Sequence, residues 1–203
     1  RMVEALGMRS TVLGGGGFLG QHITRMLLAR GEAVRIFNRG AYPALVAPGA
    51  TGCQGDILDY EAVRAACEGS DTVFHTVAVC DIVRSRRRYY EVNVRGTAHV
   101  IRACLETGVR HLVYTSTPSV VVGQEDIIGG DESLPYPSRY TAPYPATKAV
   151  AEQMVLAANC WEMVVGGVGE SRTGSGLAHL RTCALRPHLI WGPGDPHIIP
   201  KLF

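Results

Sequence analysis

The stretch that most constrains the fold is a run of glycines placed between a short apolar segment and an amphipathic one. Residues 10–31 read STVLGGGGFLGQHITRMLLARG, so that Gly14, Gly17 and Gly20 form a G-x-x-G-x-x-G pattern. Apolar residues then recur at helical spacing up to Gly31, where a helix is expected to stop. A glycine turn between a strand and a helix presents backbone N–H groups and a helix N-terminus to a pyrophosphate. The stretch therefore predicts a nucleotide-binding turn.

The rest of the chain alternates apolar strands with helices, which is typical of a parallel sheet covered on both faces. We predict a Rossmann-type, doubly wound α/β fold with six strands. Helices are expected at residues 60–68, 89–107 and 144–158, the last with an apolar stripe through Ala146, Val150 and Met154. Later strands are expected at residues 33–37, 51–58, 72–79, 111–117 and 180–185. Residues 118–145 and 166–176 are expected to be loops.

The composition excludes several classes of protein. The 203 residues suffice for one domain, and a net charge of +2 does not call for nucleic acid as a partner. No apolar run is long enough to span a bilayer, and the first ten residues lack a secretory signal. The six cysteines and seven histidines show no metal-ligand spacing. We therefore expect a cytoplasmic protein with reduced cysteines and no metal site.

The second strand ends at Asn38 and Arg39, where a dinucleotide-binding fold places the residue that reads the adenosine ribose. An acidic residue there would bind the 2′-hydroxyl of NAD. Asn38 has no charge to repel a 2′-phosphate, and Arg39 has a guanidinium that could pair with one. This favours NADP(H), with NAD(H) as the alternative; a solvated turn is the purely structural interpretation.

Two other polar features have both a structural and a functional interpretation. Asp56 and Ile57 follow the third strand, where they could contact adenine, or Asp56 could cap the helix that follows. The cluster of Arg84, Arg86, Arg87 and Arg88 is typical of a solvated face. It could also attract an anionic cofactor or substrate.

The chemistry is expected from Tyr144 and Lys148, which are spaced i, i+4 at the start of a helix. This spacing puts both side chains on one face, and a nearby ammonium lowers the pKa of a phenol. Such a tyrosine can act as the acid or base for a secondary alcohol and a ketone. Hydroxyl groups that could orient the substrate oxygen occur at the end of the fifth strand, in Thr115, Ser116 and Thr117.

These motifs together resemble the extended short-chain dehydrogenase/reductase family from about Thr11 to Pro200. GGGGFLG, GDIL, HTVA, EVNVRGT, VYTST, YPATK and CALRP occur in the order of that family. HLVYTST, APYPATKAVAEQMVLAAN and LRTCALRPHLIWGPGD are most similar to its 3β-hydroxysteroid dehydrogenase branch. FNRGAYPAL and RPHLIWGPGD particularly resemble bacterial 2-alkyl-3-oxoalkanoate reductases.

The resemblance implies roles for individual residues. It assigns catalysis to Tyr144 and Lys148, with Thr117 at the family's Ser/Thr position and Asn93 at its helix-four asparagine. The cofactor contacts expected with it are Gly14, Gly17, Phe18, Leu19, Gly20, Asn38, Arg39, Asp56, Ile57, Ala78, Thr115, Ser116, Tyr144, Lys148 and Pro187.

The resemblance also implies an NAD(P)-dependent oxidoreductase that acts on CH–OH groups of a small hydrophobic substrate. The substrate would be of the 3β-hydroxysteroid or 2-alkyl-3-oxoalkanoate type, in steroid or lipid metabolism. A nucleotide-sugar epimerase or dehydratase, and a non-catalytic NADP-binding regulator, are the alternatives.

Members of the family continue past the GPG segment, so residues 1–203 are expected to be the NAD(P)-binding domain, with most of the substrate-binding part missing after about residue 190. Apolar residues after Arg186, Leu189 and Trp191 among them, are then expected to form an exposed patch. The chain is expected to bind NADP(H), turn over little alone, and self-associate, with a homodimer as one form.

Overall fold

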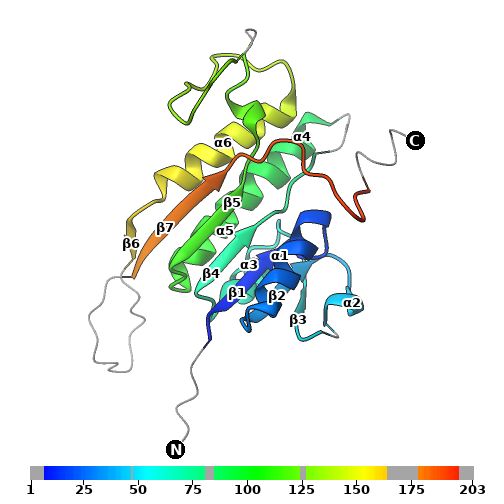
Figure 1. Cartoon of the computed structure of the whole chain (residues 1–203). Coiled ribbons are helices and arrows are strands. Elements are labelled where there is room, and N and C mark those ends of the chain that lie inside the picture. Colours follow the sequence, from blue (N-terminus) through cyan, green and yellow to red (C-terminus); the bar gives the residue numbers. More distant parts are fainter. Residues whose placement is uncertain (1–6, 47, 81–84, 124–126, 164–177, 197–203) are drawn as a thin grey trace, which may run out of the picture.

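The structure is a computed structural model that describes residues 7–46, 48–80, 85–123, 127–163 and 178–196. Its centre is a seven-stranded sheet with the strand order β3-β2-β1-β4-β5-β7-β6 (Figure 1). The strands are β1 (Arg9–Leu13), β2 (Ala33–Asn38), β3 (Thr51–Gln54), β4 (Thr72–His75), β5 (His111–Thr115), β6 (Trp161–Met163) and β7 (Ala178–Leu185). All neighbouring pairs are parallel except β6 and β7. The predicted six-stranded parallel sheet is confirmed, and β6 adds a short antiparallel edge.

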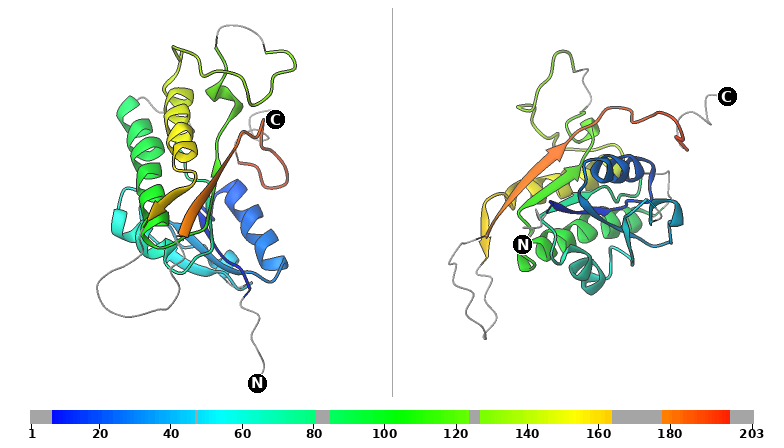
Figure 2. Two further views of the ribbon diagram at one scale, coloured as in Figure 1. Left: turned by 90° about the vertical axis from the view of Figure 1, so that its left-hand side faces the viewer. Right: turned by 60° about the horizontal axis from the view of Figure 1, so that its bottom comes forward.

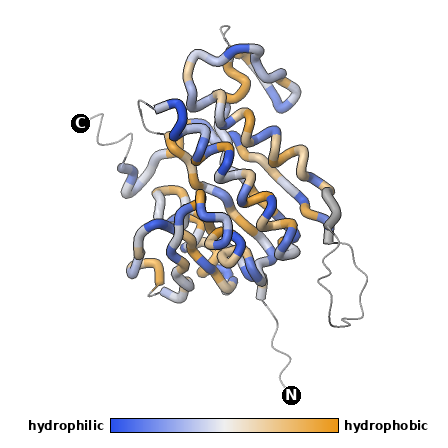
Figure 3. Tube along the Cα trace, turned by 180° about the vertical axis from the view of Figure 1, so that it is seen from behind, coloured by the Kyte–Doolittle hydropathy of each residue, from blue (hydrophilic) through white to orange (hydrophobic). Residues whose placement is uncertain are grey.

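Helices cover the two faces of the sheet unequally. The helix α1 (Phe18–Ala29) lies on one face, whereas α5 (Gly96–Glu106) and α6 (Pro143–Ala157) lie on the other (Figure 2). The short helix α2 (Pro43–Val46) contacts α1, and α3 (Tyr60–Cys67) contacts α5. Alternate residues of β1 point to opposite faces, so that Val12 and Leu13 enter different core clusters. Apolar side chains thus fill both sides of the central strands, and the tube of Figure 3 shows how apolar segments alternate with polar ones.

Two of the apolar residues expected in an exposed patch after Arg186 are exposed, Leu189 and Trp191, the latter at 67%. Leu185, at the end of β7, is also exposed. Trp191 therefore does not pack into a core. The last residues assigned to this patch, from 197 onward, lie outside the described ranges, as does the predicted loop at 166–176. Within those ranges, no helix is both long and apolar enough to cross a bilayer.

The helix predicted over residues 89–107 is interrupted by a wider turn. It consists of α4 (Arg86–Tyr89), the π-helical segment η1 (Tyr90–Arg95) and α5. Single π-helical turns inside α-helices occur mostly at functional sites. The predicted inward residues Val92, Val100, Ala103 and Cys104 are all buried. Hydrophobic spacing therefore found the buried face, but it could not detect one extra residue in a turn.

The predicted apolar stripe of α6 is wrong at Val150, which is 44% exposed, whereas Met154 packs against the core. The buried residues of the helix are Thr147, Lys148, Ala149, Ala151, Glu152 and Val155. Three of these six side chains are polar, so apolar spacing alone does not identify the face that packs on the sheet. A helix with buried charges at two successive turns needs specific partners for them, and these partners lie in the candidate site.

The glycine turn after β1 is packed too closely to admit side chains. Gly14 has a φ of +84°, and a Cβ atom built on it would lie 2.6 Å from the Thr76 hydroxyl oxygen. Thr76 is held there because its hydroxyl donates to the carbonyl of Leu13 at 2.8 Å. A Cβ atom on Gly20 would lie 2.1 Å from the carbonyl oxygen of Gly14. The turn can therefore approach its neighbours only because these positions are glycine.

We predict that Gly14→Ala destabilises the fold more than Gly31→Ala. Both positions have positive φ, but nothing lies within 4 Å of a Cβ atom on Gly31. Gly31→Ala should cost only the backbone strain of about 1–2 kcal/mol. Gly14→Ala should cost about 1–3 kcal/mol more because of overpacking. Urea denaturation of both variants measures the difference, and equal losses would contradict the close packing at Gly14.

Candidate dinucleotide groove and catalytic cluster

A groove of about 550 Å³ opens where β1, β2, β3 and β4 end. The carboxyl ends of parallel strands are the usual place for ligands in open α/β sheets. Seven predicted contacts line it, namely Gly14, Gly17, Asn38, Arg39, Asp56, Ile57 and Ala78. The other lining residues were not predicted as contacts, and they are Phe37, Gly40, Tyr42, Gly55, Thr76, Val77, Val79, Arg88 and Val92. The groove thus brings together residues from four separate strand ends.

Asn38 and Tyr42 hold the glycine turn at one wall of this groove. The backbone N–H of Gly16 donates to the Asn38 side-chain oxygen at 2.7 Å. The Tyr42 ring lies against Gly16, since a Cβ atom there would be 2.2 Å from the ring. Asn38 therefore positions the turn with its oxygen and keeps its amide N–H groups for a ligand.

Asp56 is free for a role in the groove because another residue caps the next helix. The N-cap of α3 is Asp59, whose carboxylate accepts from the N–H of Ala62 at 3.2 Å. Asp56 instead accepts from the N–H of Leu58 at 3.0 Å within its own turn. The alternative in which Asp56 caps α3 is therefore wrong, and its carboxylate borders the groove.

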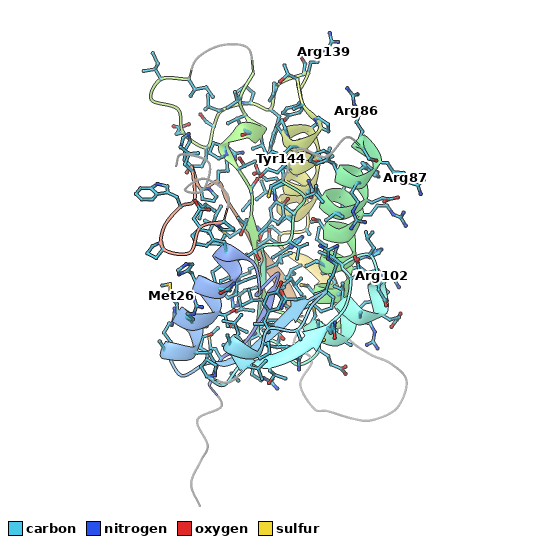
Figure 4. All side chains as sticks on the ribbon, turned by 90° about the vertical axis from the view of Figure 1, so that its right-hand side faces the viewer. Met26, Arg86, Arg87, Arg102, Arg139 and Tyr144 are labelled. Carbon is cyan, nitrogen blue, oxygen red and sulfur yellow. The ribbon has the colours of Figure 1, made fainter. Side chains whose placement is uncertain are left out.

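Lys148 and Tyr144 lie outside this lining, on α6. Figure 4 shows the position of Tyr144 on this helix. The Lys148 side chain is 2% exposed, and its ammonium donates to the carbonyl of Thr115 at 2.6 Å. The ammonium nitrogen also lies 4.1 Å from the centre of the Tyr114 ring. Burial lowers the pKa of Lys148 to about 7, although the carboxylate of Glu152 opposes this shift.

The phenol of Tyr144 does not have the lowered pKa that its spacing from Lys148 predicts. Burial raises its pKa, and a hydrogen bond with the Thr117 side chain lowers it only in part. Desolvation of the phenolate outweighs the effect of Thr117, while the ammonium of Lys148 is bonded to the carbonyl of Thr115. Of the three predicted hydroxyl residues, Thr117 is the one that affects the pKa of Tyr144.

Asn93 connects the catalytic cluster to the groove. Its side-chain oxygen accepts from the N–H of Val79 at 2.8 Å, and its amide donates to the carbonyl of Val79 at 3.2 Å. The amide also donates to the hydroxyl of Thr147 at 3.1 Å. Val79 lines the groove, and Thr147 lies between Tyr144 and Lys148 on α6. Asn93 thus fixes the distance between the two parts of the site.

A buried ion pair, which the sequence analysis missed, anchors the inner face of α6. Glu152 is fully buried and accepts from the Arg186 guanidinium at 2.6 and 3.1 Å. The hydroxyl of Tyr136 donates to the same carboxylate at 2.7 Å. These partners hold the pKa of Glu152 below its usual value against the effect of burial. The pair joins α6 to the residue that follows β7.

The remaining predicted contacts do not line the groove. Phe18, Leu19 and Gly20 form the first turn of α1, and Pro187 follows Arg186. Ser116 is buried, and its backbone N–H donates to the carbonyl of Leu185 at 2.6 Å.

His75 is a buried, uncharged histidine. Burial lowers the pKa of His75 to about 3, so that it stays neutral. In the part of the chain that the structure describes, no three His, Cys, Asp or Glu side chains could together hold a metal ion.

We predict that Lys148 gives the fold a pH-dependent stability. Its pKa is about 7 when folded and near 10.5 when unfolded, so the unfolded chain binds more protons between these values. The free energy of unfolding should therefore rise with pH from about 7 to 10, by at most about 1.4 kcal/mol per unit from this group. Lys148→Met should lack this part of the rise. Urea denaturation of both proteins across this range tests it, and a constant difference between them would contradict the burial of a neutral amine.

The chain is similar to known proteins over most of its length. Residues 11–203 match the model of the 3-beta hydroxysteroid dehydrogenase/isomerase family. A 2-alkyl-3-oxoalkanoate reductase of Shewanella oneidensis is 44% identical over 191 residues, which are 94% of this chain and 47% of that protein. A 3 beta-hydroxysteroid dehydrogenase/Delta 5-->4-isomerase of Mycobacterium tuberculosis is 40% identical, over 96% of this chain and 50% of that protein.

The solved structure of MoeE5 in complex with UDP-glucose and NAD has a similar fold. It superimposes with a TM-score of 0.74 at 27% identity, over 94% of this chain and 58% of that one. The chain spans about half the length of the curated relatives it matches. It belongs to the 3-beta hydroxysteroid dehydrogenase/isomerase family.

Proposed function

We propose that this chain binds NADP(H) and forms the cofactor-binding part of an oxidoreductase that interconverts a secondary alcohol and a ketone on a hydrophobic substrate. The observation that carries the proposal is the cluster at the end of β5. There the Thr117 side chain interacts with Tyr144 and lowers its pKa, and Lys148 lies one helical turn further along α6, with its ammonium bonded to the carbonyl of Thr115. A tyrosine placed beside a second hydroxyl can exchange a proton with a substrate oxygen bound between them.

The groove fits a dinucleotide in its chemistry. Close packing of Gly14 and Gly20 leaves backbone instead of side chains at the turn. The N-terminus of the twelve-residue helix α1 follows that turn and favours a negatively charged pyrophosphate. When bound, the nicotinamide would supply or accept the hydride. The groove residues would hold the adenosine half, and Ala78 would border the path toward Tyr144.

In this proposal each residue of the cluster has a separate task. Tyr144 gives its proton to the carbonyl oxygen during reduction and takes it back during oxidation. Thr117 orients the same oxygen, and Lys148 holds a cofactor ribose. Asn93 acts as a positioning residue, because it contacts Val79 and Thr147 and no reacting group.

The names of the related proteins indicate which substrates to test first. Two proteins at 44% and 46% identity are named 2-alkyl-3-oxoalkanoate reductase, and two at 39% and 40% are named for 3β-hydroxysteroids. Nucleotide-sugar epimerases are represented among solved structures at 25–31% identity. We therefore propose a 2-alkyl-3-oxoalkanoate as the first substrate to test, a 3β-hydroxysteroid as the second and a UDP-sugar as the alternative.

The NADP preference can be tested at Arg39. Its guanidinium borders the groove next to Asn38, and no acidic residue occupies that strand end. Arg39→Ala should weaken NADPH binding by about 1–3 kcal/mol, the value of a lost hydrogen bond to a charged group. NADH, which lacks the 2′-phosphate, is the internal control and should change little. Fluorescence titration with both cofactors measures this, and tighter binding of NADH by the unaltered chain would refute the preference.

The proton transfer can be tested at Tyr144. Tyr144→Phe should leave NADPH affinity unchanged and lower turnover by about 10²–10⁴-fold, because only the proton donor is lost. Tyr90→Phe is the matched control, since Tyr90 is exposed on η1. NADPH oxidation is followed with each of the three substrate classes. Near-normal turnover in Tyr144→Phe would reject the assignment, and binding without turnover of any substrate would favour a non-catalytic role.

A further inference from the structure

We infer that Arg88 is a second cation for the 2′-phosphate of NADP(H), acting together with Arg39. This inference rests on the proposed cofactor. Arg88 belongs to the arginine cluster for which the sequence allows two interpretations, a solvated face or a patch that attracts anions. Arg88 differs from Arg86 and Arg87 in its position, its exposure and its partners.

Arg88 lines the groove, although it comes from a different element than the strand ends. It lies on α4, just before the buried Tyr89, and Val92 lines the same groove one turn further along. The side chain of Ser85 caps α4 by accepting from the backbone N–H of Arg88 at 3.4 Å. The backbone of Arg88 is thus held at its N–H and by the burial of the next residue.

The neighbouring arginines point elsewhere. Arg86 and Arg87 are exposed and extend away from the molecule in Figure 4. Arg87 donates to Glu91 at 2.7 Å in an ion pair. Arg88 is half-buried, and its guanidinium makes no ion pair or hydrogen bond with any residue that the structure describes. Arg88 contributes to the lowered pKa of Glu91, but that carboxylate is paired with Arg87, so among the described residues the half-buried Arg88 guanidinium keeps its donors for an anionic ligand with several acceptor oxygens.

The charges of the groove favour a phosphate at this end. Arg39 and Arg88 contribute two positive charges, and Asp56 is the one acidic residue among the lining side chains. The groove therefore keeps a net positive charge, which suits the doubly charged 2′-phosphate. The pyrophosphate has its own site at the glycine turn and the start of α1. The groove contains Asn38 and Arg39 from the end of β2, whereas Tyr144 and Lys148 lie outside its lining. We therefore assign the groove to the adenosine half of the cofactor.

The test compares Arg88→Gln with Arg87→Gln, two adjacent arginines of which only one lines the groove. Calorimetric titrations use NADPH and 2′,5′-ADP, which carry the 2′-phosphate, and NADH and 5′-AMP, which do not. Arg88→Gln should weaken the first pair by about 10- to 100-fold, the effect of a lost charged hydrogen bond, and change the second pair by less than about 2-fold. Arg87→Gln should change none of the four. Arg88→Lys should recover part of the loss, because it keeps the charge without the planar fork.

The possible results separate this inference from the proposed function. Equal weakening of all four ligands by Arg88→Gln would show a contact to the pyrophosphate or a change in groove shape, and would overturn the inference. Unchanged affinities would overturn it as well, while an effect of Arg39→Ala alone would leave the NADP proposal standing. If the unaltered chain binds NADH as tightly as NADPH, both the cofactor preference and this inference fail. Thermal denaturation of each variant shows whether a loss comes from unfolding.

Discussion

The site depends on the backbone contacts that tie the glycine turn to the strands on both sides of β1. The N–H of Gly14 donates to the carbonyl of Phe37 at the end of β2, at 2.9 Å. On the other side, the N–H of Thr76 donates to the carbonyl of Leu13 at 3.0 Å, just after β4 ends. From there Asn93 continues the connection through Val79 to α6. Two sets of hydrogen bonds, joined by the backbone of residues 76–79, therefore connect the glycine turn to the catalytic helix.

The inner face of α6 carries two ionisable groups, and their partners stabilise the two charges to very different degrees. Glu152 has a guanidinium and a phenol as partners, which stabilise its charge in a buried position. The contacts of Lys148 with described residues are a carbonyl and an aromatic ring, both of them neutral. Burial outweighs the opposing attraction of the Glu152 carboxylate, and the pKa of Lys148 falls accordingly. The same helix thus holds a charge that is structurally satisfied beside one that is poised near neutrality.

Much of the fold and part of the site could be predicted from the sequence. The spacing of residues along the chain predicts the glycine turn, the six parallel strands, and the pair Tyr144 and Lys148. The edge strand β6 was missed because three residues are too few for a periodic signal. Glu152 was missed because a buried charge interrupts the apolar pattern that marks a buried face, and its partner Arg186 is 34 residues away.

Other parts of the site depend on contacts between distant segments. Tyr42 follows the second strand as an ordinary loop residue, and only folding brings its ring against Gly16. Arg88 is one member of a run of arginines, among which the sequence offers no reason to choose. The lowered pKa expected for Tyr144 failed because spacing on a helix reports proximity and not the loss of solvent. Burial and partner choice are properties of the assembled chain.

The orientation of Arg88 depends on the number of residues in the π-helical segment η1 as well as on their identity. Each residue of a regular α-helix advances the chain by about 100° around its axis. The widened turn at Tyr90–Arg95 sets the rotation between α4, which borders the groove, and α5, whose residues enter the core. Removing one residue from η1 would turn Arg88 to another side relative to α5 and would also displace Val92 and Asn93, which are buried in η1. Along this helix, deletions and insertions would therefore alter the ligand groove more than most substitutions.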